Sequence, residues 1–144
     1  MSRKYPSHPL VGVAAVVLRD RQVLLILRGK EPAKGLWGLP GGLLELGETL
    51  AQGARREIQE ECNIIVEPGP VVGVFEPMDQ DGDGRWRYHF VVVDLLARYV
   101  SGDLQAGDDA ADARWVALEA MDELPMTAET QDIIWKAVGM SPSS

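Results

Sequence analysis

The sequence has one cysteine, a deficit of basic residues and no long apolar run. Because Cys62 is alone among 144 residues, an intrachain disulfide and a cysteine-rich zinc site are both excluded. Acidic residues outnumber basic ones by 22 to 14, and no local basic patch offsets the net charge of −8, which argues against a nucleic-acid polymer as partner. No run approaches the ~18 apolar residues that span a bilayer, and MSRKYPSHPL lacks the apolar core of a signal peptide. We therefore expect a cytoplasmic protein without a membrane partner.

Several common functional motifs are also missing. No glycine-rich loop ends in G-K-S or G-K-T, and no G-x-G-x-x-G is present, so P-loop and Rossmann nucleotide sites lack support. The stretch DQDGDG, residues 79–84, matches the first half of an EF-hand calcium loop, but Phe90 stands where the twelfth residue should be glutamate. We interpret this stretch as a hairpin loop. The length predicts one domain over residues 1–144, with flexible ends at 1–8 and 140–144.

The apolar runs predict a sheet and two helices. LVGVAAVVLRD (10–20) and QVLLILR (22–28) form a predicted hairpin, and further strand signals lie at 63–67, 70–78, 85–100 and 113–118. Helices are predicted at 50–62 and at 128–138, the second starting after Thr127 and stopping at Gly139. The glycine-rich residues 29–47 read as mostly loop with one short strand at most, and 101–112 as a second loop. This order predicts an α/β fold in which helices cover a mixed sheet.

The first predicted helix has clear ends. Thr49 and Gln52 have the spacing of a capping box, and Asn63 tolerates the left-handed conformation that commonly follows a last helical residue. An apolar stripe predicts the buried side of this helix, with Cys62 as a small core residue; it comprises Ala51, Ala54, Ile58 and Cys62.

Three glutamates crowd one face of the same helix, and the apolar stripe lies on the flank away from Glu60. At ~100° per residue, Glu57, Glu60 and Glu61 all fall on one face. Like charges at these spacings cost ~0.2–0.5 kcal/mol per pair in water and more where water is excluded. Such a face is either a solvated acidic surface or a site for a divalent cation.

The residues around these glutamates favour the cation site. From Gly42, five residues lead to Glu48, seven more lead to Arg56, and R-E-I-Q-E-E-C-N-I follows. This pattern strongly resembles the Nudix box, and the flanking GLWGLPGG and DARWVAL resemble the usual context of that family. Only Asn63 departs from the pattern, which has glycine there, and asparagine is the next best residue in a left-handed conformation.

The resemblance implies a Nudix α/β/α sandwich, with a mixed sheet between helices, that hydrolyses a pyrophosphate bond using Mg²⁺ or Mn²⁺. By the same resemblance, Glu57 and Glu61 are metal ligands, Glu60 is a ligand or the general base, and the Gly41 carbonyl is an additional ligand. Arg56 orients the site by pairing with Glu48, or forms an ordinary pair with Glu60 four residues on. A further acid is expected from a later loop, with Asp109 as the first candidate and Asp108 and Asp112 as alternatives.

Candidate residues for the substrate phosphates are cationic side chains outside the box. Arg28, at the end of the second strand, is the first choice, and Lys30, Arg85 and Arg87 are weaker ones. Trp37 and Trp86 are candidates for stacking a base, although a tryptophan among apolar residues is more often part of a core.

The substrate class depends on loops outside the box. The family's members act on dinucleotides, nucleotide sugars, ADP-ribose or nucleoside triphosphates, and the proline that marks many ADP-ribose members is replaced here by Gln80. We rank ADP-ribose or a nucleotide sugar first and a (d)NTP-cleaving enzyme of nucleotide-pool sanitation second. A non-catalytic nucleotide sensor is the alternative of another class, and the intact box argues against it. Members of the family often dimerise, so the sequence leaves both a monomer and a homodimer as candidate assemblies.

Overall fold

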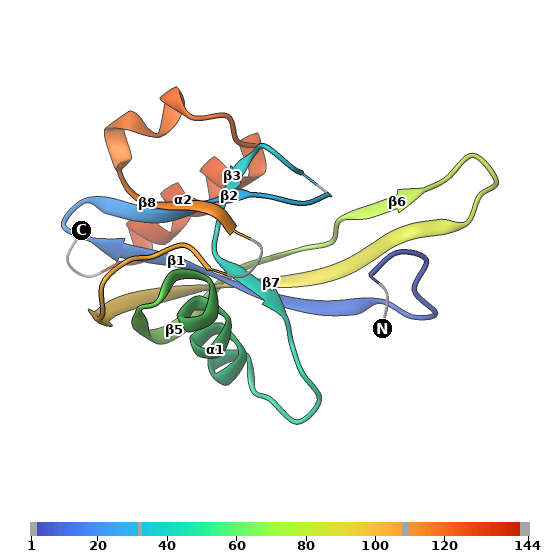
Figure 1. The fold of residues 1–144 in the computed structure, drawn as a ribbon, viewed down its shortest axis with the longest axis horizontal. Coiled ribbons are helices and arrows are strands. Elements are labelled where there is room, and N and C mark those ends of the chain that lie inside the picture. Colours follow the sequence, from blue (N-terminus) through green and yellow to red (C-terminus); the bar gives the residue numbers. More distant parts are fainter. Residues whose placement is uncertain (1–2, 32, 108–109, 142–144) are drawn as a thin grey trace.

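The computed structural model describes residues 3–31, 33–107 and 110–141, and Figure 1 shows their arrangement. In chain order the elements are β1 (Leu10–Arg19), β2 (Gln22–Arg28), β3 (Trp37–Gly38), β4 (Gly41–Leu43), α1 (Leu50–Cys62), β5 (Ile65–Phe75), β6 (Met78–Gln80), β7 (Trp86–Ser101), β8 (Ala110–Ala117), the 3₁₀ helix η1 (Leu118–Glu123) and α2 (Ala128–Met140).

The sheet is mixed. One edge of its central strand, β1, pairs with two different strands, β2 and β4. The strand order is β3-β2-β1-β7-β5, with β8 also paired to β2. The long pairing of β1 with β7 is parallel, and the other pairings are antiparallel. On its other side, β1 pairs with β2 only at Leu18 and Arg19, while residues 12–14 pair with β4. The two hairpin strands therefore diverge, and the glycine-rich β4 occupies the space between them.

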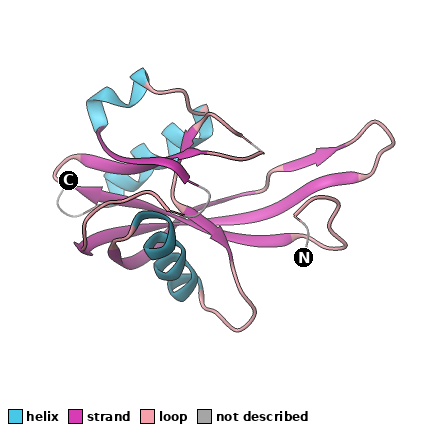
Figure 2. Cartoon of the chain, viewed as in Figure 1, coloured by secondary structure: helices cyan, strands magenta, loops and turns pink. Residues whose placement is uncertain are grey.

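Helices cover both faces of this sheet, as Figures 1 and 2 show. On one face, Ile58 and Cys62 of α1 pack with buried residues of β1, β2, β5 and β7. On the other face, Ile134 and Ala137 of α2 pack with Val16, Val72 and η1. The predicted α/β/α sandwich with a mixed sheet is confirmed, and so is the predicted core position of Cys62. No helix among the described residues is both long and apolar enough to cross a membrane.

Several predicted boundaries differ from the observed ones. The strands expected at 63–67 and 70–78 are one irregular strand, β5, because an edge strand tolerates the prolines at its Pro68-Gly69-Pro70 segment. Residues 29–47 hold two short strands rather than one at most, and β8 starts at Ala110 rather than Ala113. These added pairings are with β1 and β2, so local periodicity does not reveal them. Helix α2 ends at Met140, one residue beyond the predicted stop.

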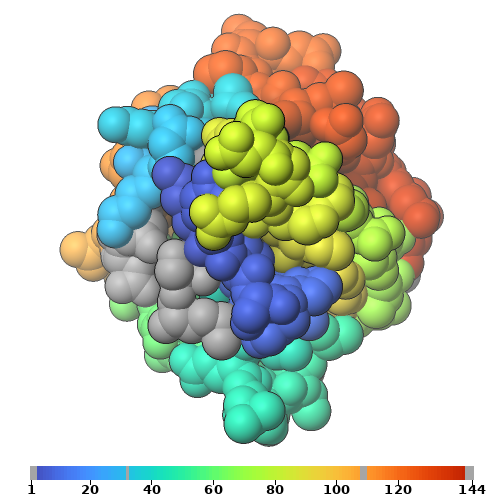
Figure 3. All heavy atoms as spheres, turned by 90° about the vertical axis from the view of Figure 1, so that its right-hand side faces the viewer, coloured from blue at the N-terminus to red at the C-terminus, as the bar shows by residue number. Residues whose placement is uncertain are grey.

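The DQDGDG stretch closes a hairpin between β6 and β7, as predicted. The Asp81 carboxylate accepts hydrogen bonds from the backbone N–H groups of Asp83 and Arg85, and a third from the Tyr5 hydroxyl. The Tyr5 N–H also donates to the Arg87 carbonyl. Figure 3 shows these N-terminal residues, in blue, lying against the yellow hairpin. Of the ends expected to be flexible, residues 1–2 and 142–144 lie outside the described residues.

Asp94, in the middle of β7, is a buried carboxyl group. It is 1% exposed, and its Oδ1 atom accepts no hydrogen bond from any described residue. Burial raises the pKa of Asp94 to about 7 because the charged form loses its hydration. The carboxyl group therefore resists ionisation until near neutral pH.

We expect Asp94→Asn to stabilise the protein at alkaline pH. Because the pKa of Asp94 is raised in the folded state, this group lowers the free energy of unfolding only slightly near pH 4, and the loss grows as pH rises toward 7 and is complete above it. Urea unfolding should show a gain of about 1–3 kcal/mol at pH 8.5 and little change at pH 4. An equal change at both pH values would mean that ionisation of Asp94 is not its source.

Candidate active site

Local backbone features fix the position of the acidic helix α1. The Thr49 hydroxyl accepts from the Gln52 N–H while the Gln52 side chain accepts from the Thr49 N–H, so the predicted capping box is present. Asn63 ends the helix with φ 60° and ψ 30°, the predicted left-handed conformation. Its side chain also donates to the Asp103 carbonyl, which ties the end of the helix to the loop after β7.

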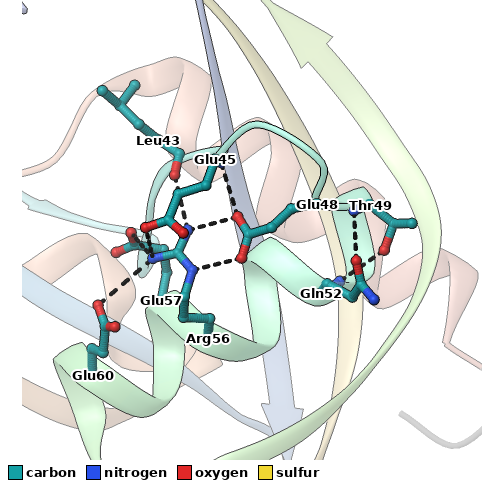
Figure 4. A network of polar contacts seen from close by, with 8 residues as sticks. All are labelled: Leu43, Glu45, Glu48, Thr49, Gln52, Arg56, Glu57 and Glu60. Carbon is teal, nitrogen blue, oxygen red and sulfur yellow. Dashed lines mark hydrogen bonds and ion pairs between the residues drawn. The ribbon is translucent and has the colours of Figure 1, made fainter. Parts of the chain in front are cut away.

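Arg56 is the centre of a polar network that links α1 to the loop before it (Figure 4). Its guanidinium donates to both carboxylate oxygens of Glu48, at 2.6 and 2.8 Å, and to the Leu43 carbonyl at 3.1 Å. A further hydrogen bond of 2.7 Å reaches Glu57, and Glu60 lies 3.7 Å away. Both predicted pairings of Arg56 therefore exist, and the bidentate one with Glu48 is the closer.

Glu48 is held in the ionised state by this network. The hydrogen bonds from Arg56, followed by the one from the Glu45 N–H, lower the pKa of Glu48 to about 2. Reciprocally, Glu48 raises the pKa of Arg56 above its ordinary value. The loop from Leu43 to Glu48 is therefore attached to the helix by an ion pair whose two members stay charged at neutral pH.

Glu57 lies against the glycine-rich strand β4. A Cβ atom added to Gly42 would overlap the Glu57 carboxylate, so only glycine lets the two approach. The side chain of Glu57 is only 16% exposed, and burial raises its pKa, although Arg56 acts in the opposite direction. The helix thus presses a poorly hydrated carboxylate onto the backbone of β4.

Glu61 and Glu60 occupy different environments. Glu61 is buried, with 7% exposure, and its Oε1 accepts a 2.9 Å hydrogen bond from the Gly41 N–H. The Glu60 side chain is 49% exposed. The three carboxylates that the sequence places on one face therefore differ in exposure, because α1 turns Glu61 toward β4 and leaves Glu60 toward solvent.

The donors around β4 fit a hard cation that also takes water or phosphate oxygens. Among the described residues, no three acidic, histidine or cysteine side chains converge as a complete metal cluster. Mg²⁺ usually takes one or two carboxylates and completes its shell with waters and substrate oxygens. Glu57 and Glu61, which both reach β4, are such a pair.

The loop that should bring a further acid also lies beside α1. The Gln105 N–H donates to the Cys62 carbonyl and the Gly107 N–H to the Glu61 carbonyl, at 3.0 and 2.8 Å. Asp108 and Asp109 come next and lie outside the described residues. The alternative Asp112 is engaged by Arg114 at 2.9 Å. Sequence reasoning missed Gly107, where a Cβ atom would lie 2.7 Å from the Glu60 carbonyl, and its only signal was a glycine before two aspartates.

The predicted substrate residues are dispersed. Arg28 is partly buried at a β-bulge where β2 meets β8, and Lys30 follows in the exposed loop. Arg87 pairs with Asp79 at 3.4 Å and lines a cavity of about 390 Å³ with Lys4, Glu31 and Tyr88, none of which belongs to α1. Trp37 is 6% exposed in the core, and Arg114 covers one ring face at 4.9 Å, which favours the core interpretation over base stacking. Trp86 is 44% exposed beside His89.

The charged pair predicts how acid affects stability. Because the pKa of Glu48 is lowered on folding, its stabilising effect is present above its ordinary value of 4.5 and is lost as pH falls toward 2. Glu48→Gln should therefore lower the urea midpoint at pH 6 and lose less stability than the parent between pH 5 and pH 2.5. Parallel acid profiles for the two proteins would contradict this assignment.

Comparisons with known proteins identify this arrangement. A family model described as the NUDIX domain matches residues 8–136. The chain is 35% identical over 122 residues to the ADP-ribose pyrophosphatase of Methanocaldococcus jannaschii, covering 85% of this chain and 70% of that protein. It spans less than half the length of several other curated relatives that it matches.

Solved structures agree with the sequence relatives. A MutT NUDIX hydrolase from Burkholderia pseudomallei superposes with a TM-score of 0.75 and 32% identity, over 90% of this chain and 98% of that one. The NUDIX domain of Shewanella oneidensis NrtR, complexed with ADP ribose, gives a TM-score of 0.72 and 26% identity over 94% and 90% of the two chains. The chain belongs to the Nudix hydrolases, a family of enzymes that act on pyrophosphate bonds.

Proposed function

We propose that the protein is a Mg²⁺-dependent hydrolase, with Mn²⁺ as an alternative, that cleaves the pyrophosphate bond of a nucleoside diphosphate linked to another moiety. The observation that carries this proposal is the pair of carboxylates, Glu57 and Glu61, held against β4 while Arg56 and Glu48 fix the loop beside them. A sensor without catalysis would not need both carboxylates and their supporting pair.

The Gly41 carbonyl completes the proposed metal-binding set. Pro40 and Leu44 hydrogen-bond to β1 through their backbones, whereas the Gly41 N–H points away from β1 to Glu61. In an extended strand the N–H and C=O groups of one residue point to the same side, so the Gly41 carbonyl also faces α1. Glu57, Glu61 and Gly41 would then hold the cation, which neutralises phosphate oxygens and lowers the pKa of a bound water.

Other residues would supply the remaining roles. Glu60, whose side chain is half-exposed, is either a further metal ligand or the base that accepts the proton of the attacking water. Asp109 would add an acid from the loop that Gly107 anchors to the helix. Arg28, Lys30 and Arg87 are the cations proposed for the substrate phosphates.

Among substrates, ADP-ribose or a nucleotide sugar ranks first. The relative from Methanocaldococcus jannaschii is named an ADP-ribose pyrophosphatase, and the NrtR domain was solved with ADP ribose. A (d)NTP pyrophosphohydrolase is the second candidate, since the similar Burkholderia structure is named MutT. The lone buried Cys62 suits the cytoplasm as the working compartment.

A substrate panel tests the proposed reaction. The protein should be incubated with Mg²⁺ and ADP-ribose, four nucleoside diphosphate glucoses or a dNTP, and the products separated by chromatography. Cleavage of ADP-ribose should yield AMP and ribose 5-phosphate, whereas the second candidate predicts a nucleoside monophosphate and pyrophosphate from the dNTP. Failure to cleave any compound with Mg²⁺ or Mn²⁺ between pH 6 and 9 would refute the enzymatic function.

Glu61→Gln tests the metal-binding role. The amide keeps the shape of the side chain and an oxygen for the Gly41 N–H, but it lacks the charge that a divalent cation needs. We expect about a 10–100-fold loss in turnover or metal affinity with an unchanged unfolding transition. Glu67→Gln is the matched control, because the Glu67 side chain is 57% exposed and forms a surface ion pair with Arg55. Equal activity of the two variants would remove Glu61 from the metal site.

A further inference from the structure

The loop after β7 runs along the last turn of α1, as Figure 1 shows in orange. The Gln105 N–H donates to the Cys62 carbonyl at 3.0 Å, and the Gly107 N–H donates to the Glu61 carbonyl at 2.8 Å. The last four carbonyl groups of an α-helix lack partners inside the helix, and helix ends fray. Residues 102–107, which we name the clasp, therefore close the turn that carries Glu61.

Asn63 fastens the clasp to the helix with its side chain. It ends α1 in the left-handed conformation, and its Nδ2 atom donates to the Asp103 carbonyl at 3.0 Å. The glycine that the Nudix pattern has at this position could adopt the same backbone conformation, but it has no side chain that donates. The departure from the pattern therefore keeps the helix stop and adds a tether between the helix and the clasp.

The backbones of the clasp and the helix approach closely at two glycines. A Cβ atom on Gly107 would lie 2.7 Å from the Glu60 carbonyl oxygen, and one on Gly102 would lie 2.7 Å from the Asn63 carbonyl oxygen. Cβ atoms essentially never come so close to a backbone oxygen. A larger residue at either position would therefore push the clasp away from α1.

The sheet and the core hold the clasp as well. The Tyr99 hydroxyl of β7 donates to the Gly102 carbonyl at 2.7 Å, at the start of the clasp. Leu104 is partly buried and packs against the core cluster that contains Ile58 and Cys62. These contacts restrict the movement of the segment that supplies N–H groups to the end of α1.

Glu61 is held at both of its ends. Its carboxylate accepts a hydrogen bond from the Gly41 N–H, and its carbonyl accepts one from the Gly107 N–H. We propose that the clasp positions the Glu61 carboxylate for a divalent cation, with Asn63 and Gly107 as its positioning residues. This inference rests on the proposed function, because it takes Glu61 to be a metal ligand. Linkage is reciprocal, so a cation that binds more tightly when the clasp is closed stabilises the closed clasp by the same factor.

Hydrogen exchange of the Gln105 and Gly107 amides, followed by NMR, measures closure of the clasp without substrate. Asn63→Gly keeps the left-handed stop and removes the side-chain tether, so in EDTA it should speed exchange at both amides about 3–10-fold, the effect of losing one hydrogen bond. Saturating Mg²⁺ should slow the same amides about fivefold or more in the parent and leave them unchanged in Glu61→Gln.

Gly107→Ala tests the reciprocal effect on metal affinity. The added Cβ atom is incompatible with the closed clasp, so Mg²⁺ should bind more weakly by the factor that slows exchange in the parent. Isothermal titration calorimetry measures this affinity without turnover, and unfolding curves check that the fold is kept. Gly82→Ala is the matched control and should bind Mg²⁺ like the parent, because Gly82 lies in the hairpin between β6 and β7 and an added Cβ atom would meet no described atom within 4 Å.

The outcomes that overturn the proposal are distinct from failure of the enzymatic function. Clasp amides that exchange equally with and without Mg²⁺ in the parent contradict the coupling, and so does unchanged Mg²⁺ affinity in Gly107→Ala. Exchange in Asn63→Gly as slow as in the parent removes Asn63 from the clasp. Equal Mg²⁺ binding by the parent and Glu61→Gln refutes both the metal-binding role of Glu61 and this inference. Coupling between Mg²⁺ and the clasp without cleavage of any compound would refute the hydrolase function and leave the role of the clasp intact.

Discussion

The bidentate pair between Arg56 and Glu48 is the interaction on which the site depends. It connects the loop before α1 to the middle of the helix, and the same guanidinium reaches the Leu43 carbonyl and Glu57. An arginine fork fixes direction as well as distance, which a lysine ammonium would not. Because Arg56 is mostly shielded from water, these contacts hold both ends of the β4–α1 connection in register.

The Arg56 network fixes α1 against a strand rather than a flexible loop because the hairpin of β1 and β2 diverges. Strand β1 leaves β2 after two residue pairs, and β4 takes the vacated edge of the sheet. Close packing there requires residues without side chains, since a Cβ atom on Gly41 would collide with β1 and one on Gly42 with Glu57. The glycines therefore bring a strand backbone, rather than a flexible loop, against Glu57 and Glu61.

The two faces of the sheet have different roles in this arrangement. The α1 face supplies charge, with carboxylates whose mutual repulsion Arg56 relieves in part and a bound cation would relieve further. On the opposite face, Asp94 is buried, and its Oδ1 atom accepts no hydrogen bond from the residues that the structure describes.

The sequence by itself determined the local features of the protein. The Thr49 and Gln52 cap, the Asn63 stop, the hairpin of β1 and β2 and the chain positions of the box glutamates all follow from neighbours a few residues apart, and each of these features is present. Local physics suffices because helix caps and hairpins are decided within a few residues.

Only the tertiary structure decided the environment of each carboxylate. Glu60 and Glu61 are adjacent in sequence, yet one is half-exposed and the other is buried against Gly41, because β4 approaches α1 from one side. Asp94 reads in the sequence as one polar residue in an apolar strand, and its isolation arises from Ala14, Gly73 and Ile133, which come from three other elements. Burial and electrostatics depend on these distant neighbours, so no local pattern could have predicted them.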